Sequence, residues 1–224
     1  MNRKAVLIFA DPIGLDLARR RLPRFLRPLL SWRRLAKTSH LADLHLFSSG
    51  KLPTFEGCTA HEQVGANFAE RLEAATEKLA AFGYDEIVVI GADCPSLAPS
   101  DIAMAFHELA DKRLVLGPDH RGGCYLIALR AEDRALLQGV RWKRNRDYDQ
   151  LRQRVAAGAV ASLAVKLDVD SWADVWLLAR AGHRLAEWCC AFLSAANATH
   201  NCFVDLSAQA LRVRGQMPPP ASAA

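Results

Sequence analysis

The sequence predicts an α/β protein, with helices on both faces of a mostly parallel sheet in a three-layer α/β/α arrangement. Continuous apolar runs such as residues 5–10 and 87–90 have the length of strands and lack the alternation of a strand with one wet face. Segments with helical spacing of apolar residues stand between such runs. The 224 residues are 51% hydrophobic and 24% charged, which provides ample apolar surface for a core and excludes disorder as the main state.

Strands are expected where an apolar run is bounded by polar or turn-forming residues. The run at residues 87–90 is the clearest, because all four of its residues are isoleucine or valine. The predicted strands cover residues 5–10, 44–47, 87–90, 114–116, 125–129 and 160–167.

Helices are expected where apolar residues recur at steps of three and four. Residues 63–82 have this spacing, and Gly83 then fits the C-terminal cap. Pro99 suits the first turn of a helix, where a missing N–H costs nothing. The predicted helices cover residues 63–82, 99–110, 147–157 and 172 to the 190s.

One domain is expected over residues 1–204, ending in a helical extension, followed by a tail over residues 205–224. The tail is expected to be disordered from about residue 216, because three prolines and three alanines fall in its last nine residues. No run of 18 apolar residues suggests a membrane span, and the six cysteines form no Cys-x-x-Cys pair for zinc. We therefore expect a cytoplasmic protein with reduced thiols.

The positive charge of the chain is concentrated in two segments. The net charge is +5, yet residues 19–37 alone carry eight positive charges and no acid, and residues 141–154 carry six positive and two negative charges. Such segments usually bind anions, which include phosphate, nucleic acid and lipid headgroups. A solvated helix face and contact with a membrane surface through residues 19–37 are the alternatives for the first segment. We favour local recognition of a small anion over a nucleic-acid-binding surface.

Polar turns that follow strands are the expected place for a ligand, because ligands of open α/β sheets bind at the carboxyl ends of the strands. Asp93 stands just after the strand at 87–90 and could hold a hard divalent cation or cap the next helix. Asp168 and Asp170 alternate at the end of a predicted strand, so both would point the same way and could reach one cation, although Asp170 could also cap the last helix. The pair Gly122-Gly123 would allow close approach to a ligand or form a tight hairpin turn.

Several segments, in one order and over residues 5–178, resemble the radical-SAM/selenodomain-associated transferase type 1 family. The sequence G-A-D-C-P-S-L at residues 91–97 is similar to the family's Gly-Ser-Asp-x-Pro-x-Leu core. Residues 117–126, which include the double glycine, are similar to its Gly-Pro-x-x-Asp-Gly-Gly-Tyr-Tyr-Leu segment. The other segments that carry the resemblance are residues 9–22, 63–71, 168–171 and Trp142.

The resemblance implies the nucleotide-diphospho-sugar transferase (GT-A-like) fold and a nucleotide or nucleotide sugar bound over the first strands. On this basis Asp93 would hold Mg²⁺ or Mn²⁺ against the diphosphate, and Asp170 would be a second metal contact or a catalytic base. The resemblance also assigns nucleotide or phosphate binding to Ala10, Arg19, Arg21 and Asp93. It assigns substrate binding to Arg121, Gly122, Gly123, Tyr125 and Trp142.

Four positions depart from the pattern of this family. Asp11 stands in place of a lysine, Asp16 in place of a glycine, and Arg121 in place of the aspartate before the double glycine. Lys143 follows Trp142, where serine or threonine is usual. These changes imply an altered ligand or a lost activity, and Arg121 with the extra arginines could offset the added acids.

The leading hypothesis for function is a glycosyltransferase-like enzyme that transfers a sugar from a nucleoside-diphosphate donor to a small-molecule acceptor. One alternative is a nucleotidyltransferase that takes a nucleoside triphosphate and releases pyrophosphate. Another is a catalytically degenerate relative that keeps the fold as a binding or scaffold module.

Overall fold

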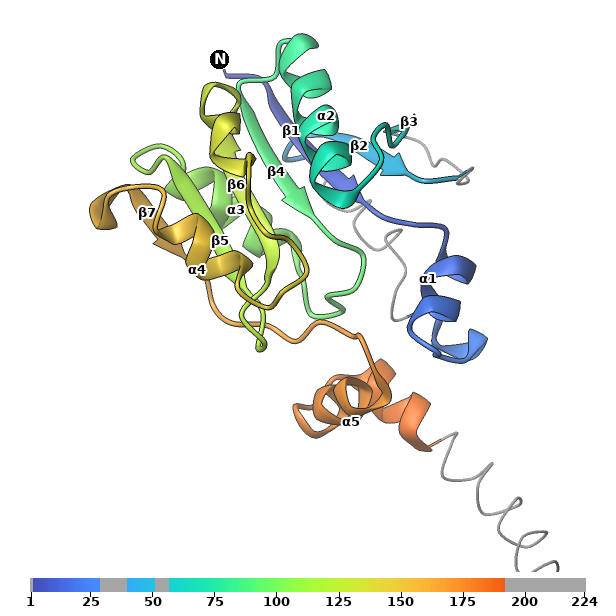
Figure 1. Cartoon of the computed structure of the whole chain (residues 1–224). Coiled ribbons are helices and arrows are strands. Elements are labelled where there is room, and N and C mark those ends of the chain that lie inside the picture. Colours follow the sequence, from blue (N-terminus) through green and yellow to red (C-terminus); the bar gives the residue numbers. More distant parts are fainter. Residues whose placement is uncertain (1, 29–39, 51–56, 192–224) are drawn as a thin grey trace, which may run out of the picture.

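The structure, a computed structural model, describes residues 2–28, 40–50 and 57–191. Within them, seven strands form one sheet in the order β3-β2-β1-β4-β6-β5-β7 (Figure 1). The predicted C-terminal tail and residues 29–37 of the basic segment at 19–37 lie outside the described residues. The strands are β1 (Lys4–Phe9), β2 (Asp43–Ser48), β3 (Cys58–Glu62), β4 (Glu86–Ile90), β5 (Leu114–Pro118), β6 (Cys124–Arg130) and β7 (Val160–Ser162).

The sheet is mostly parallel, as predicted. The pairs β1–β2, β2–β3, β1–β4 and β5–β7 are parallel, whereas β6 pairs antiparallel with both β4 and β5. Among the described strands, β6 therefore runs against the direction of all the others. The carboxyl ends of β1, β4 and β5 consequently meet at the same edge of the sheet, where a ligand is expected.

Helices cover both faces of this sheet. The α-helices are α1 (Ile13–Arg19), α2 (Phe68–Ala81), α3 (Pro99–Glu108), α4 (Asp147–Arg152) and α5 (Trp172–Arg180), and the short 3₁₀ helices are η1 (Arg24–Leu26), η3 (Ala131–Leu137) and η4 (Ala157–Ala159). Helix α3 packs against one face of the sheet, and α2, η3 and α4 pack against the other. This arrangement confirms the three-layer α/β/α prediction.

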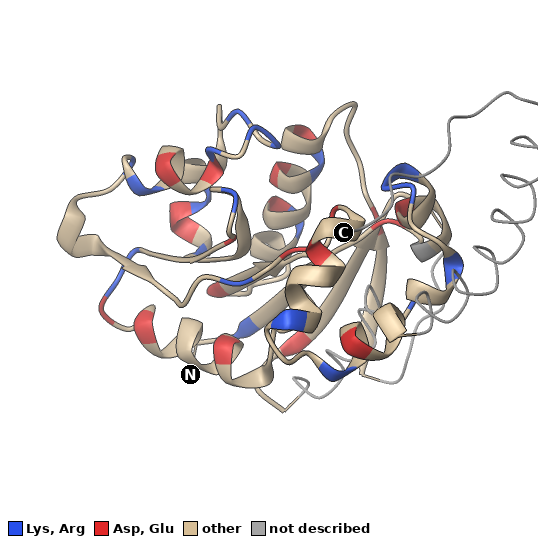
Figure 2. Cartoon of the chain, turned by 90° about the horizontal axis from the view of Figure 1, so that it is seen from below, with Lys and Arg blue, Asp and Glu red and all other residues tan. Residues whose placement is uncertain are grey.

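Strand β1 shows why residues 5–10 form a continuous apolar run in the sequence. Val6 and Ile8 pack in the cluster with α3, while Ala5 and Leu7 pack in the cluster with α2, so both faces of the strand are covered. All four are fully buried. Lys, Arg, Asp and Glu residues lie on the helices, the loops and the strand ends (Figure 2), so the strand interiors carry no such charges.

A third cluster of apolar side chains joins the two ends of the described chain. Leu17 of α1 and Leu26 of η1 pack with Val175 and Leu178 of α5 and with Cys189. This cluster positions α1 beside the segment that precedes α5, which matters for the site below. None of the helices in the described ranges is long and apolar enough to cross a membrane.

Some predicted boundaries are wrong, for local physical reasons. The helix predicted from residue 63 begins at Phe68, because the side chain of Asn67 caps it by accepting from the Glu70 N–H at 3.0 Å. The helix predicted from residue 172 into the 190s is interrupted at Gly182, which has a φ of 81°, and helical structure resumes at residues 184–191.

Two further differences concern the last strand and the fourth helix. The strand predicted over residues 160–167 shortens to β7, with one further bridge between Asp119 and Lys166. The helix predicted to reach residue 157 ends at Arg152. Strand β3, helix α1 and the 3₁₀ segments were not predicted.

Candidate functional site

A cavity of about 680 Å³ lies at the carboxyl ends of β1 and β4. Strand β1 contributes Phe9 and Ala10 to its wall, and the turn after β4 contributes Asp93. The β5–β6 hairpin adds Asp119, and helix α1 closes one side with Arg20. The cavity therefore occupies the place where open α/β sheets bind their ligands.

The turn after β4 places Asp93 inside this cavity. A Cβ at Gly91 would overlap a carboxylate oxygen of Asp93, so only glycine lets the side chain fold back over the turn. The carbonyl of Asp93 accepts a 2.8 Å hydrogen bond from the N–H of Val169, which fixes the two segments side by side. Asp93 does not cap α3, because Asp101 accepts from the Ala98 N–H at that helix end at 2.7 Å.

Asp168 and Asp170 flank Val169 and have different surroundings. Residues 168–170 lie beyond β7, so strand alternation does not set the directions of these two side chains. Asp168 is 8% exposed, whereas the side chain of Asp170 is 52% exposed. Both line the cavity. Asp170 does not cap α5 either, since Ser171 and Asp174 do so.

Asp168 is the most perturbed acid of the site. Burial, together with the negative charges of Asp93 and Asp119, raises its pKa to about 9. Its Oδ1 is buried and has no hydrogen-bond partner among the described residues. A buried carboxylate oxygen without a partner is costly, so it marks a place where a ligand or a cation would be stabilised.

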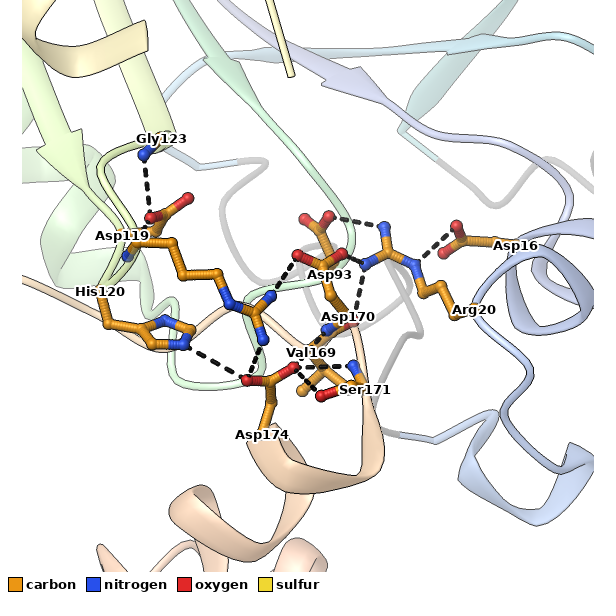
Figure 3. A network of polar contacts seen from close by, with 11 residues as sticks. Asp16, Arg20, Asp93, Asp119, His120, Gly123, Val169, Asp170, Ser171 and Asp174 are labelled. Atoms are coloured by element: carbon orange, nitrogen blue, oxygen red, sulfur yellow. Dashed lines mark hydrogen bonds and ion pairs between the residues drawn. The ribbon is translucent and has the colours of Figure 1, made fainter. Parts of the chain in front are cut away.

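Arg20 connects three of the acids of the site (Figure 3). Its Nε donates to Asp16 at 2.9 Å, its Nη2 donates to Asp93 at 2.8 Å, and its Nη1 donates to Asp170. Burial alone would lower the pKa of this guanidinium, but the carboxylates of Asp93 and Asp16 outweigh it and raise the pKa. Arg20 is thus a fixed positive charge inside the acidic cluster.

Arg121 connects Asp170 to helix α5. Its Nη1 donates to Asp170 Oδ2 at 2.6 Å, and its Nη2 donates to Asp174. His120 approaches the same oxygen of Asp174 at 3.3 Å. Burial would raise the pKa of Asp174, but the hydrogen bonds from Ser171 and Arg121 hold it below its usual value.

The double glycine belongs to the β5–β6 hairpin. Gly122 has a φ of 95°, and a Cβ there would lie 2.5 Å from the carbonyl oxygen of Asn145. A Cβ at Gly123 would overlap the carboxylate of Asp119, whose Oδ1 accepts from the Gly123 N–H at 2.9 Å. Of the two alternatives for this pair, the hairpin turn is the one observed. The groups that lie close to the two glycines are the Asn145 carbonyl and the Asp119 carboxylate of this chain.

Aromatic side chains form another part of the wall. The rings of Phe9 and Phe68 lie 5.2 Å apart, and those of Phe68 and Trp142 lie 5.6 Å apart. Lys143 Nζ lies 4.6 Å above the Phe68 ring, and Lys143 itself has a φ of 60°, which is unusual for a residue with a side chain. The indole N–H of Trp142 is buried and has no partner among the described residues.

The structure gathers most of the predicted site residues around this cavity. The predicted residues that line it are Ala10, Arg19, Asp93, Gly123, Tyr125, Trp142 and Asp170. Tyr125 is nevertheless almost wholly buried, and its hydroxyl donates to the Ala164 carbonyl at 3.0 Å. Gly122 and Arg121 are absent from the lining, because the first serves the hairpin and the second is held by Asp170 and Asp174.

The structure places Arg20, and not the predicted Arg21, at the cavity. Arg21 is exposed, lies outside the lining and has a φ of 55°, because it follows the end of α1. Arg20, which was not predicted as a site residue, points into the cavity. The signal that could have found it is the spacing of Asp16 and Arg20, which puts them on one helix face four residues apart.

The added acids of the first loop are also paired. Asp11 accepts from Arg19 and from Ser49, and Asp16 accepts from Arg20. The two negative charges that depart from the family pattern therefore have counter-charges close by in the sequence.

The donors around Asp93 fit a hard divalent cation in chemical type. Carboxylate oxygens are the ligands that Mg²⁺ and Mn²⁺ prefer, and Asp168 Oδ1 is buried beside Asp93 without a partner. Within the described ranges, however, no three or more His, Cys, Asp or Glu side chains are arranged to hold a metal ion. The guanidinium of Arg20 already bonds Asp93 and Asp170.

The fold is similar to that of several solved structures. A candidate nucleotide-diphospho-sugar transferase from Desulfovibrio desulfuricans G20 superposes with a TM-score of 0.71 at 20% identity, covering 87% of this chain and 98% of that one. The manganese complex of Rv0371c from Mycobacterium tuberculosis H37Rv gives a TM-score of 0.52 at 18% identity, covering 79% and 98%. The 4-diphosphocytidyl-2C-methyl-D-erythritol synthase from Anaerococcus prevotii DSM 20548 gives 0.53 at 10% identity, covering 77% and 92%.

These likenesses confirm the predicted nucleotide-diphospho-sugar transferase-like fold. A search of proteins with curated functions found no significant match. One family, described as "Uncharacterized protein conserved in bacteria (DUF2064)", matches residues 31–144. Since this match spans half of the chain, the protein belongs to the DUF2064 family.

Proposed function

We propose that this protein binds a nucleotide sugar with Mg²⁺ or Mn²⁺ in the 680 Å³ cavity and transfers the sugar to a small-molecule acceptor. The observation that carries the proposal is the pair formed by Asp93, in the turn after β4, and the buried Asp168, which has an unpartnered oxygen. The resemblance to the radical-SAM/selenodomain-associated transferase type 1 family supports it. So do the nucleotide-sugar, manganese and cytidylyl names of the similar structures.

Asp93 and Asp168 would hold the cation, which would supply neutralisation of the charge on the diphosphate leaving group. Arg19, at the rim, is 52% exposed and would bind a phosphate on exchanging its partner Asp11 for the ligand. Asp170 is the proposed further contact to this cation or, as the alternative, the base for the acceptor hydroxyl. Two guanidiniums bond its carboxylate oxygens, so one of them would have to move away before a ligand could contact that oxygen.

The aromatic wall is the proposed position of the flat or apolar parts of the donor. Phe68 and Trp142 line the cavity and present ring surface, on which a base or a sugar face can stack. Lys143 lies at the same wall and would add a positive charge near the ligand. Gly123 and Tyr125 would shape the floor beneath it.

The carboxylate contacts of Arg20 and Arg121 favour a second candidate function. Arg20 and Arg121 form ion pairs with Asp93 and Asp170, the acids proposed to act in the reaction. Acids that are held in ion pairs fit a binding module that has the fold but catalyses no reaction. A nucleotidyltransferase shares the fold and the cation chemistry, and it differs in releasing pyrophosphate. Product analysis with sugar nucleotides and with nucleoside triphosphates separates the three functions.

A thermal-shift panel tests the proposal. Nucleoside diphosphates, triphosphates and sugar nucleotides are added with Mn²⁺ to the full chain, and at least one is expected to raise the melting temperature. Asp93→Asn should abolish this rise, because it removes the charge that holds the cation. Asp111→Asn, at an exposed acid outside the cavity, is the matched control and should keep it. Failure of every nucleotide to shift the wild-type protein would refute the proposal.

A further inference from the structure

Three carboxylates from distant parts of the chain converge on one guanidinium (Figure 3). Asp16 belongs to α1, Asp93 follows β4, and Asp170 precedes α5. Arg20 Nε reaches the first at 2.9 Å and Nη2 reaches the second at 2.8 Å, while Nη1 bonds the third. Nη1 also donates to the Val169 carbonyl at 2.7 Å. The guanidinium is thus surrounded by oxygen atoms, as a bound cation would be.

A positive charge is needed between the carboxylates of Asp16, Asp93 and Asp170. Carboxylates that face one another without a cation repel strongly in a partly buried site. The side chain of Arg20 is only 17% exposed and that of Asp93 only 26%, so water screens this repulsion poorly. A divalent cation prefers the same carboxylate oxygens, and it cannot occupy the space of a guanidinium that already bonds them.

We propose that Arg20 is a built-in counter-cation, which occupies the divalent-cation position at Asp93 and Asp170 and withdraws when a cation binds. This inference rests on the proposed function, because it concerns the same cavity. It adds a regulatory step: the binding-competent state of the site is the one in which Arg20 has left Asp93.

The local structure gives Arg20 a partner when it leaves. Asp16 lies four residues earlier, in helix α1, which Arg20 follows directly, and the Nε that bonds it is a different atom from those that bond Asp93 and Asp170. A rotation of the guanidinium about this contact would release both distant carboxylates. The added acid at position 16 thereby has a role, which is to keep the displaced charge on α1.

Arg121 keeps the outer carboxylate in place during the exchange. It bonds Asp170 Oδ2, whereas Arg20 bonds Asp170 Oδ1. When Arg20 withdraws, Oδ1 faces the cavity while Oδ2 stays tied to the hairpin. Only one oxygen of Asp170 is therefore available to a cation.

Binding of Mn²⁺ alone to the full chain tests this inference, measured by electron paramagnetic resonance or calorimetry. A site that is closed most of the time binds more weakly in proportion to its open fraction, so Arg20→Gln should tighten Mn²⁺ binding by about tenfold or more. Arg20→Lys keeps the charge but cannot span three carboxylates, so its affinity should fall between those of wild type and Arg20→Gln. Arg21→Gln makes the same charge change at an exposed neighbour outside the cavity and should leave the affinity unchanged.

Stability provides a second readout. Without metal, Arg20→Gln should melt at a lower temperature than wild type, and Mn²⁺ should restore more of the melting temperature than it adds to wild type. Equal or weaker Mn²⁺ binding by Arg20→Gln, or no measurable binding by either protein, would overturn the inference. If Arg20→Gln does not fold, an affinity of Arg20→Lys no higher than that of wild type overturns it.

The two proposals can fail separately. Nucleotides that shift wild type while Arg20→Gln gains no Mn²⁺ affinity would overturn the counter-cation and leave the proposed function standing. A gain in Mn²⁺ affinity with no nucleotide binding would support the counter-cation and refute the proposed function.

Discussion

Acidification should destabilise the protein through one buried histidine, His45 of β2. This side chain is 5% exposed and takes part in a directed chain of hydrogen bonds. Tyr84 donates to Asp43 at 2.7 Å, so its oxygen must accept from His45 Nε2, which lies 2.8 Å away. His45 Nδ1 then accepts from His61 Nε2 at 3.0 Å. The chain uses both ring nitrogens of His45, and with this direction of the bonds the ring is neutral.

The size of the effect follows from the pKa of this group. Burial, and then the nearby His61, lowers the pKa of His45 from 6.5 to about 4. Between these values the unfolded chain takes up a proton that the folded chain does not, so stability falls as the pH drops from about 6.5 towards 4. At pH 5 the loss is about 2 kcal/mol, which corresponds to a melting temperature lower by roughly 4–8 °C for a chain of this size. The pKa of His61, lowered by burial and by Lys78, adds to the loss in the same direction.

Urea unfolding near pH 7.5 and pH 5 measures this loss in wild type and in His45→Gln. Glutamine cannot gain the proton, so the drop in unfolding free energy between the two pH values should be smaller in the variant by about 2 kcal/mol. Taking the difference between proteins removes the contribution of the acids, which titrate in both. His107→Gln, at an exposed histidine of α3, should show the full drop of wild type. An identical drop in His45→Gln and wild type would refute the reasoning.

Two further predictions concern stability away from the cavity. Asn67→Ala removes the side chain that caps α2 and should lower the free energy of unfolding by about 1 kcal/mol, measured by urea unfolding; no loss would contradict the cap. Gly117→Ala puts a Cβ 2.5 Å from the ring of the buried Tyr125 and should cost about 1–3 kcal/mol in the same measurement. Gly14→Ala is the matched control for this variant, since nothing lies within 4 Å of its added Cβ; a similar loss in both would contradict the steric argument.

The strands that could be predicted are those whose two faces are both buried. Strand β4 has five buried residues in succession, and the last four of them form an uninterrupted apolar run in the sequence. Strand β3 could not be predicted in this way. Its sequence, C-T-A-H-E, is mostly polar, because it is a partly exposed edge strand that pairs only with β2. Strand β3 forms because it pairs with the edge of β2, and its own residue types do not indicate that pairing.

The candidate site divides in a similar way. Asp93 could be predicted because the rule that places ligands at strand ends needs only one strand and the residue after it. Arg20 could not, because its partners Asp93 and Asp170 are 73 and 150 residues away. The helical phase of α1, which separates Arg20 from Arg21, could not be predicted either, since Pro12 and Gly14 are residue types that are more typical of turns than of helices.

Three of the four departures from the family pattern are charged residues that each contact a residue of opposite charge. Asp11 is paired with Arg19, Asp16 with Arg20, and Arg121 with Asp170 and Asp174. Loss of a site by random substitution would leave buried charges unpaired, each at a cost of several kcal/mol. In this structure each charge that departs from the pattern at these three positions has a partner of opposite sign, and Asp93 and Asp168 still line the cavity. Compensated substitutions therefore favour a site adapted to a different ligand over one that has decayed, and the arginines that provide the compensation are the residues at which that adaptation should be measured.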